Sequence, residues 1–345
     1  MPNYDKPYKT YPEMLAILRS RNIIITNEEY AIEALSSLSY YDLINGNKQI
    51  FCADPKNDEF FAETTFESLY YAYTAQYSIH NLVLKYIIYI EKSFKTKLSH
   101  VVAENLGVSH SPILTANTNN YLCIHSYADS KKVKRLTVLK TLLSNINKLG
   151  GNDSRHTCSY YYIKNKNHIP PWILVKDISF YPAILWYRIL LSNYKSTVAK
   201  SLLSDTLQHS PICTDDEIKD FVFNALHILS KFRNAFAHGY RLSSDKINVS
   251  LSFQTLRKLL PPGVLTRSEY KKSIGKNDFT AALFSIFVMT NDPIVANTFL
   301  NELRAQITAY SKLNYSGKTI FEILGLPDQI ISKIEKINEG KFGRK

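Results

Sequence analysis

The stretch TDDEIKDFVFNALHILSKFRNAFAHG, residues 214–239, carries the most complete helix pattern in the chain. It begins with Thr214 and Glu217, whose spacing is that of a capping box, and the two aspartates between them suit the positive end of a helix dipole. It ends at Gly239, a residue type that commonly terminates helices. The apolar residues that recur between these ends at helical spacing are Ile218, Val222, Ala225, Leu229 and Phe232. The pattern predicts one long helix with a buried stripe.

Most of the remaining chain carries the same helical period. Glycine is scarce, with 11 residues, and the one hairpin-type turn, Asn45-Gly46, lacks cleanly alternating flanks. The sequence therefore predicts an all-α fold, with irregular, loop-like segments at 109–130 and 152–171. The further helices are expected at 10–22, 27–44 with Asn27 as its cap, 66–106, 131–151, 179–194, 279–290, 293–311 and 327–337.

The charge of the chain favours an anionic partner. Its 42 Lys and Arg outnumber its 30 Asp and Glu, which gives a formal net charge of +12 over 345 residues. A surplus of this size attracts polyanions such as nucleic acid.

The cysteines and the apolar runs indicate the compartment. Four cysteines are scattered without a CxxC pair, which is typical of a reducing environment. The first residues, MPNYDKPYKTYPEM, lack the apolar core of a signal peptide, and runs such as 281–289 are too short to cross a bilayer. We therefore expect a soluble, cytoplasmic protein with no membrane partner.

The helix at 214–239 ends in a cluster of polar residues, Arg233, Asn234 and His238. Asn234 and His238 are four residues apart and share a helix face. Arg233 and His238 are five residues apart, which separates them by about 140° around a regular helix. A regular helix alone would not bring these two side chains together, so we expect a kink or a helix end between them.

The chemistry available to this cluster is narrow. Histidine exchanges protons near neutral pH, and arginine matches the oxygens of a phosphate. Together they suit cleavage of RNA by attack of its own 2′-hydroxyl, which requires no metal and no cofactor. The sequence shows no convincing metal-ligand spacing. The spacing of Arg233 and His238 is also common by chance, and a histidine near a helix C-terminus is favoured by the dipole alone.

The whole pattern around this cluster points to a family. The stretch RNAFAHGYR (233–241) resembles the Arg-Asn-x-x-Ala-His signature of HEPN-fold ribonucleases, and among them the Abi-like (AbiD/AbiF type) abortive-infection proteins of bacteria. Three further segments resemble that family in the right order, and the resemblance covers about residues 6–245. These segments are KPYKTYPEMLAILRSRNIIITNEEYAIEALSSLSYYDLINGNKQIF at the N-terminus, IEKSFKTKLSHVVAENLG (90–107) and IPPWILVKDISFYPAILWY (169–187).

The resemblance implies a HEPN-like helical core, which we place at residues 61–260 after an N-terminal helical segment at 1–60. The chain changes character after Pro261-Pro262, so residues 261–345 are expected to form a C-terminal helical extension that the resemblance does not cover. The resemblance also implies that Arg233 contacts the scissile phosphate, Asn234 assists, and His238 handles the protons. Arg241 would support them, although Ser243-Ser244 stand where the family often has an asparagine. The motif occurs once in this chain, whereas HEPN nucleases typically assemble a site from two copies. A homodimer with two-fold symmetry is therefore expected.

Glu91 is a second supporting candidate. It lies on the apolar stripe of the helix expected at 66–106, between Ile87 and Phe94, where a carboxylate is costly unless it is paired. A buried Glu91 could hold Arg233 in place. The alternative is that Glu91 lies at the edge of the stripe and reaches solvent. The other histidines, such as His80, His100 and His227, are most simply helix-surface or core residues.

Basic residues elsewhere could bind RNA, beside aromatic rings that can stack on bases. The alternative for each cluster is a solvated face or a loop packed by its tyrosines. The candidate RNA-binding residues are Lys131, Lys132, Lys134 and Arg135 in one cluster, and Lys164 and Lys166 in the other.

We therefore expect a metal-independent endoribonuclease that acts in bacterial abortive infection, a defence against phage. Its partners would be substrate RNA and a second copy of the chain. The alternative is a non-catalytic RNA-binding protein of the same fold, in a ribonucleoprotein with a structured small RNA.

Overall fold

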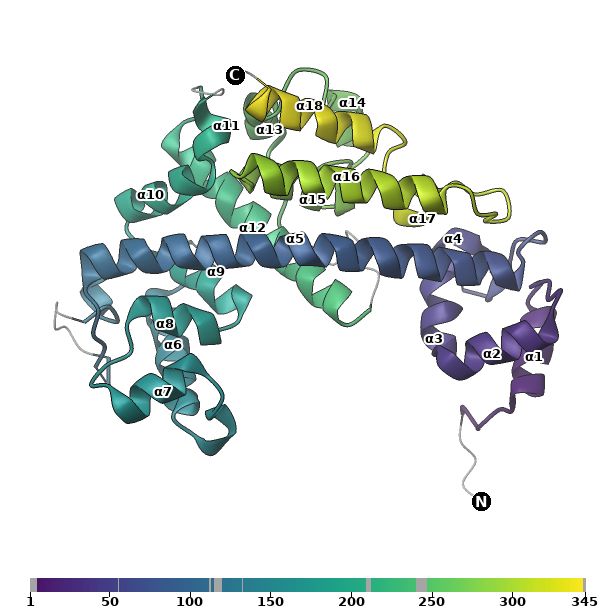
Figure 1. The fold of residues 1–345 in the computed structure, drawn as a ribbon, viewed down its shortest axis with the longest axis horizontal. Coiled ribbons are helices and arrows are strands. Elements are labelled where there is room, and N and C mark those ends of the chain that lie inside the picture. The colour runs from purple at the N-terminus through teal and green to yellow at the C-terminus, as the bar shows by residue number, and fades with distance from the viewer. Residues whose placement is uncertain are drawn as a thin grey trace. The chain divides into compact units, whose positions relative to one another are not determined.

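The computed structural model describes residues 5–54, 56–111, 113–114, 120–131, 133–208, 212–239 and 247–343. Helices dominate it, and the predicted all-α class is confirmed. Among the described residues the one sheet is a two-stranded antiparallel pair, β1 (Cys52–Asp54) and β2 (Glu59–Phe60). Figure 1 shows the order of the elements along the chain.

The chain forms two compact units, and each is discontinuous in sequence. The first unit comprises residues 1–84, 234–242 and 300–331, and the second comprises 85–233, 243–299 and 332–345. The segment-wise division at residues 60 and 260 stays a prediction. Each unit is described by itself below.

The first unit begins with a set of short helices. These are α1 (Tyr11–Ser20), α2 (Glu28–Ser37), α3 (Tyr40–Leu43), the 3-10 turn η1 (Asn45–Asn47) and α4 (Lys48–Phe51). Asn27 caps α2 as predicted, because its side chain accepts a hydrogen bond from the Tyr30 amide. The single helix expected at 27–44 was wrong. The backbone is extended at Leu38 and at Ser39, and the Ser39 hydroxyl caps a new helix by accepting hydrogen bonds from the amides of Tyr41 and Asp42.

Helix α5 (Phe66–Leu106) is one uninterrupted helix, as predicted (Figure 1). Its first half belongs to the first unit and its second half to the second unit. In the second half, the apolar stripe that the sequence predicts is fully or almost fully buried in the core of the second unit; its residues are Ile87, Ile90, Phe94, Leu98 and Val101.

The middle of the second unit differs from the prediction in two places. The segment expected to be loop-like at 152–171 contains a helix, because Thr157 caps it and the Ser159 amide donates to Asp177 at 2.7 Å. The helix expected at 179–194 divides in two, since the backbone is extended at Leu190 and Leu191. The helices here are α6 (Arg135–Leu149), α7 (Cys158–Asn165), α8 (Pro171–Asp177), α9 (Phe180–Ile189), α10 (Ser192–Leu202), α11 (Ser204–Gln208) and α12 (Asp215–Ala237).

The C-terminal helices contribute to the core as well as to the surface. They are α13 (Phe253–Leu259), α14 (Arg267–Lys271), α15 (Phe279–Met289), α16 (Pro293–Tyr310), α17 (Ile320–Leu324) and α18 (Ile330–Phe342). Every residue of α15 is buried. Its Phe279 ring stacks on Phe232 of α12, with centroids 5.7 Å apart, and Phe287 stacks on Phe299 at 4.9 Å. Helix α12 is thus anchored on a central helix of the second unit.

Candidate active site at the end of α12

The two ends of α12 behave as the sequence predicts. At its start the Thr214 amide donates to the Glu217 carboxylate at 2.8 Å, and the Glu217 amide donates to the Thr214 hydroxyl at 3.3 Å, which completes the capping box. At its end the His238 amide donates to the carbonyls of Asn234 and Ala235, both at 3.2 Å. Gly239 follows with a φ of +72°, a left-handed conformation that glycine adopts without strain. The helix ends at Ala237, so the predicted end between Arg233 and His238 is confirmed.

The apolar stripe of α12 decides which of its residues stay accessible. Its predicted members are all 3% exposed or less. Phe236, beyond the last stripe member Phe232, is buried as well, so a buried ring lies on each side of Arg233 in the sequence. The Arg233 side chain is 40% exposed, and Asn234 and His238 are exposed. The polar residues of the cluster therefore lie away from the buried stripe, with all or part of their side chains exposed to solvent.

In the second unit, Arg233 pairs with Glu91. The Nε of Arg233 lies 3.7 Å from Glu91 Oε2, which is an ion pair rather than a hydrogen bond. Glu91 is 7% exposed, so it is a buried carboxylate and does not reach into solvent from the edge of its stripe. A buried carboxylate requires compensating charge, and this one has cations on both of its oxygens.

The second cation is Lys95, which sequence analysis missed. Its Nζ lies 2.6 Å from Glu91 Oε1 and also donates to the carbonyl of Ile178 at 2.7 Å. The spacing of Glu91 and Lys95 on α5 is i, i+4, which was the available signal. Lys95 lies on the same helix as Glu91 and bridges its carboxylate to the end of α8. Arg233 therefore faces a carboxylate whose position is already fixed by another contact.

In the first unit, the cluster continues with Asn234, Phe236 and His238. The Phe236 ring stacks on the imidazole of His80, with centroids 4.1 Å apart and planes 11° from parallel. His80 comes from α5 and is 9% exposed, as expected of a core histidine. This stack fixes the last turn of α12 within its unit, while Asn234 and His238 remain exposed.

The predicted RNA-binding residues have different environments. Lys131 and Lys134 are exposed, as are Lys164 and Lys166. Arg135 instead has a structural role, since its Nη1 donates to the Tyr127 carbonyl at 2.7 Å. Lys132 and Arg241 lie outside the described residues.

The described residues contain neither a cluster of metal-ligating side chains nor a helix that could span a membrane. Within them, no three His, Cys, Asp or Glu side chains gather as a metal ion would need. Across the same parts of the chain, no helix has the length and apolar character to span a bilayer.

Comparison with known proteins identifies the family of the chain. A family model described as Abi-like protein matches residues 33–244, more than half of the sequence, and this range contains Glu91, Arg233 and His238. Searches of curated proteins and of solved structures found no match. The chain belongs to the Abi-like protein family.

Proposed function

We propose that this Abi-like protein is a metal-independent endoribonuclease of abortive-infection defence, with a HEPN-like core. The observation that carries the proposal is the contrast, at the end of α12, between one paired cation and two exposed polar residues. Arg233 is held by a buried carboxylate, and the following turn carries Asn234 and His238 as exposed residues. A positioned guanidinium beside accessible proton-transfer and hydrogen-bonding groups is what RNA cleavage through the 2′-hydroxyl needs.

The proposed reaction uses the chain's own side chains. Arg233 binds a non-bridging oxygen of the scissile phosphate, and Asn234 donates a hydrogen bond to the same group. The imidazole of His238 removes the proton from the ribose 2′-hydroxyl, whose oxygen then attacks phosphorus. The bond from phosphorus to the 5′-oxygen breaks, and that oxygen takes up a proton from an imidazolium. The products are a 2′,3′-cyclic phosphate and a 5′-hydroxyl.

One copy of His238 cannot start a turnover both as a base and as an acid. A second imidazole, in its protonated form, supplies the proton to the leaving oxygen if two chains associate about a two-fold axis. The chain has one copy of the motif, so the proposal includes a homodimer with a shared site. A monomer in sedimentation velocity at the assay concentration would contradict this part.

The experiment that tests the activity incubates purified protein with total RNA in the presence of EDTA. Wild type is compared with His238→Ala and Arg233→Ala, and the product ends are analysed. We expect chelator-resistant cleavage that leaves cyclic phosphates and is lost in both variants. Cleavage that survives both substitutions, or that requires a divalent cation, would refute the mechanism.

The alternative is a non-catalytic RNA-binding protein. Its support is the set of exposed lysines at Lys131, Lys134, Lys164 and Lys166, together with the net charge of +12. Tight RNA binding without any cleavage, unchanged by His238→Ala, would favour this alternative.

A further inference from the structure

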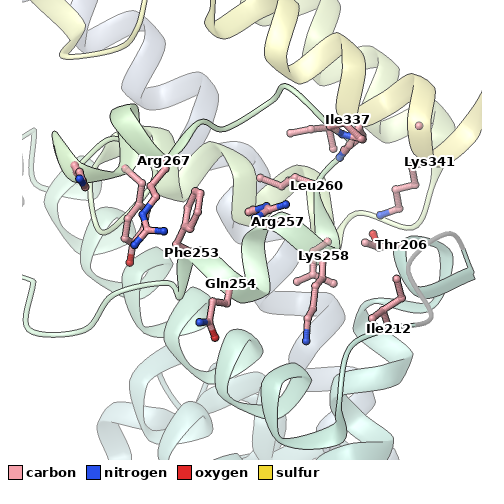
Figure 2. Close-up of a pocket in the computed structure, with 16 residues that line it drawn as sticks. Thr206, Ile212, Phe253, Gln254, Arg257, Lys258, Leu260, Arg267, Ile337 and Lys341 are labelled. Carbon is pink, nitrogen blue, oxygen red and sulfur yellow. The ribbon is translucent and has the colours of Figure 1, made fainter.

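The second unit contains a basic pocket that the proposed ribonuclease site does not use. Its volume is about 1000 Å³, and residues of α13, α14 and α18 line it, with Thr206 and Ile212 at one side (Figure 2). We call it the basic pocket. Its cationic lining residues are Arg257, Lys258, Arg267, Lys271 and Lys341, and no acidic residue lines it among the described parts of the chain.

Two of these five cations already have partners within the protein. Lys258 Nζ contacts both carboxylate oxygens of Glu217, at 2.6 and 2.7 Å. Lys341 Nζ donates to the carbonyls of Phe287, Val288 and Thr290, at 3.3, 2.8 and 2.6 Å. These carbonyls stand at the C-terminal end of α15, where a helix leaves its last carbonyls without intrahelical donors. Lys258 and Lys341 therefore build the wall of the pocket.

The other three cations, Arg257, Arg267 and Lys271, are exposed. None of them has a carboxylate within ion-pair distance among the described residues. Arg267 and Lys271 are four residues apart on α14, so they share a helix face, and like charges at that spacing repel. Three cations gathered on one concave surface would be stabilised by an anion, and two arginine forks match the oxygens of a phosphate.

Two aromatic rings also line this pocket. Phe253 of α13 and Tyr270 of α14 have ring centroids 5.2 Å apart with planes 41° from parallel, and both are half-buried. The Tyr270 hydroxyl donates to the Leu251 carbonyl at 2.6 Å, which fixes the ring. In the view of Figure 2, Phe253 lies between Arg267 and Arg257. Aromatic rings beside arginines provide a stacking surface for a base next to a phosphate site.

We propose that the basic pocket binds a nucleotide. Its phosphate contacts Arg257, Arg267 and Lys271, and its base packs against Phe253 and Tyr270. The nucleotide is either a free mononucleotide or the phosphorylated end of an RNA strand, since both present the same phosphate and base. The inference does not depend on the ribonuclease activity, because none of these residues belongs to the α12 cluster.

The test measures dissociation constants for the full-length protein by isothermal titration calorimetry. The probes are AMP, inorganic phosphate, and a 2′-O-methyl pentanucleotide with and without a 5′-phosphate, which has no 2′-hydroxyl to cleave. We expect AMP, the phosphorylated pentanucleotide or both to bind at least about tenfold more tightly than inorganic phosphate, because the base adds stacking energy. Preference for AMP identifies a free nucleotide, and preference for the 5′-phosphorylated strand identifies an RNA end.

The variants assign the binding to the pocket. The double variant Arg257→Gln/Arg267→Gln should weaken binding of the preferred probe by at least about tenfold. The variant Phe253→Leu should lower the affinity for that probe toward the affinity for inorganic phosphate. The matched control is Lys272→Gln, an exposed neighbour outside the lining, which should bind as wild type does. The single Arg267→Gln variant repeats the test if the double variant fails to fold. Absence of binding by both nucleotide probes, or affinities unchanged in the arginine variants, would overturn the proposal.

Discussion

Two arginine-bearing regions of the second unit, the end of α12 and the basic pocket, differ in how their cations are held. Arg233 lies 3.7 Å from a carboxylate that is itself buried and fixed by Lys95. Arg257 and Arg267 in the basic pocket are exposed and have no carboxylate partner among the described residues. A held arginine keeps one geometry, which suits a group that must meet a single phosphate during a reaction. Unpaired arginines suit a site that takes up an anion, because the ligand itself supplies the missing charge.

The comparison also separates two uses of buried charge. Glu91 is buried beside Arg233, for which we propose a role in catalysis, whereas Lys341 is buried and donates to the carbonyls at the end of α15. The first is expected to matter for activity and the second for stability. The predictions below test this division, from the largest expected effect to the smallest.

The largest effect should come from His238→Ala. The variant removes the proposed proton acceptor, and the loss of a general acid–base group reduces rates by about 10²- to 10⁴-fold. The side chain is exposed, so folding should be unaffected. Cleavage of a fluorescent RNA substrate, followed with EDTA present, measures the rate. His100→Ala, at a residue of α5 that is also exposed, is the control, and equal losses in both variants would exclude a specific role for His238.

Next in size is the effect of Lys341→Met on stability. The variant leaves the carbonyls at the end of α15 without their donor, which should lower the free energy of unfolding by about 2 kcal/mol. Urea denaturation measures it. Lys336→Met, on the exposed side of α18, is the control and should change stability little.

The stability difference between wild type and Lys341→Met should also depend on pH. Burial lowers the pKa of Lys341 from 10.5 to about 7, and the charge of Asp205 opposes this shift. Between pH 7 and 10 the unfolded chain therefore binds more protons than the folded one, so wild type gains stability relative to Lys341→Met as the pH rises. The gain is at most about 1.4 kcal/mol per pH unit. If the difference in free energy of unfolding between wild type and Lys341→Met were the same at pH 7 and pH 9, the titration of Lys341 would not contribute to stability in this range.

A smaller effect is expected from Glu91→Gln, which keeps the shape of the side chain and removes its charge. Arg233 then loses the carboxylate that positions it, and cleavage should fall by about tenfold. In an Arg233→Ala background the same substitution should not lower the residual cleavage any further, because the two residues act as one unit. Additive losses would mean that Glu91 acts independently of Arg233 and does not position it. Glu104→Gln, exposed on the same helix, is the control.

The smallest effect should come from Lys131→Gln combined with Lys134→Gln. Both side chains are exposed and would contact RNA only through its phosphates, so binding should weaken a few-fold and equally for different sequences. The slope of log affinity against log salt should fall by about two. Filter-binding measurements between low and moderate salt give this slope. An unchanged slope would show that these lysines do not contact RNA.

Local patterns explain where sequence-based prediction of the fold worked and where it failed. The ends of α12 and the course of α5 follow from caps and apolar spacing within a few residues. The break at Leu38 and Ser39 was missed because the apolar period continues across it, and only the new cap at Ser39 stops the first helix. The helix α7 was missed because a tyrosine-rich polar stretch has little apolar period of its own.

Prediction of the candidate site was uneven for a related reason. Arg233, Asn234 and His238 are adjacent in sequence, so their motif could be read directly. The burial of Glu91 could not be decided from its helix, because whether a residue at the edge of a stripe reaches solvent depends on what packs against it. Lys95 was overlooked although its spacing to Glu91 is local, since an i, i+4 pair is also common on solvated helix faces.

The sequence by itself determined the helical class, the capped ends of α12 and the order of the motif, because these depend on residues three or four positions apart. The tertiary structure alone decided that Glu91 faces Arg233, that Lys341 reaches the end of α15, and that α13, α14 and α18 enclose a basic pocket. These contacts join residues far apart in the chain. They are selected by burial and by the pairing of charges in the core, for which no short pattern in the sequence is a signal.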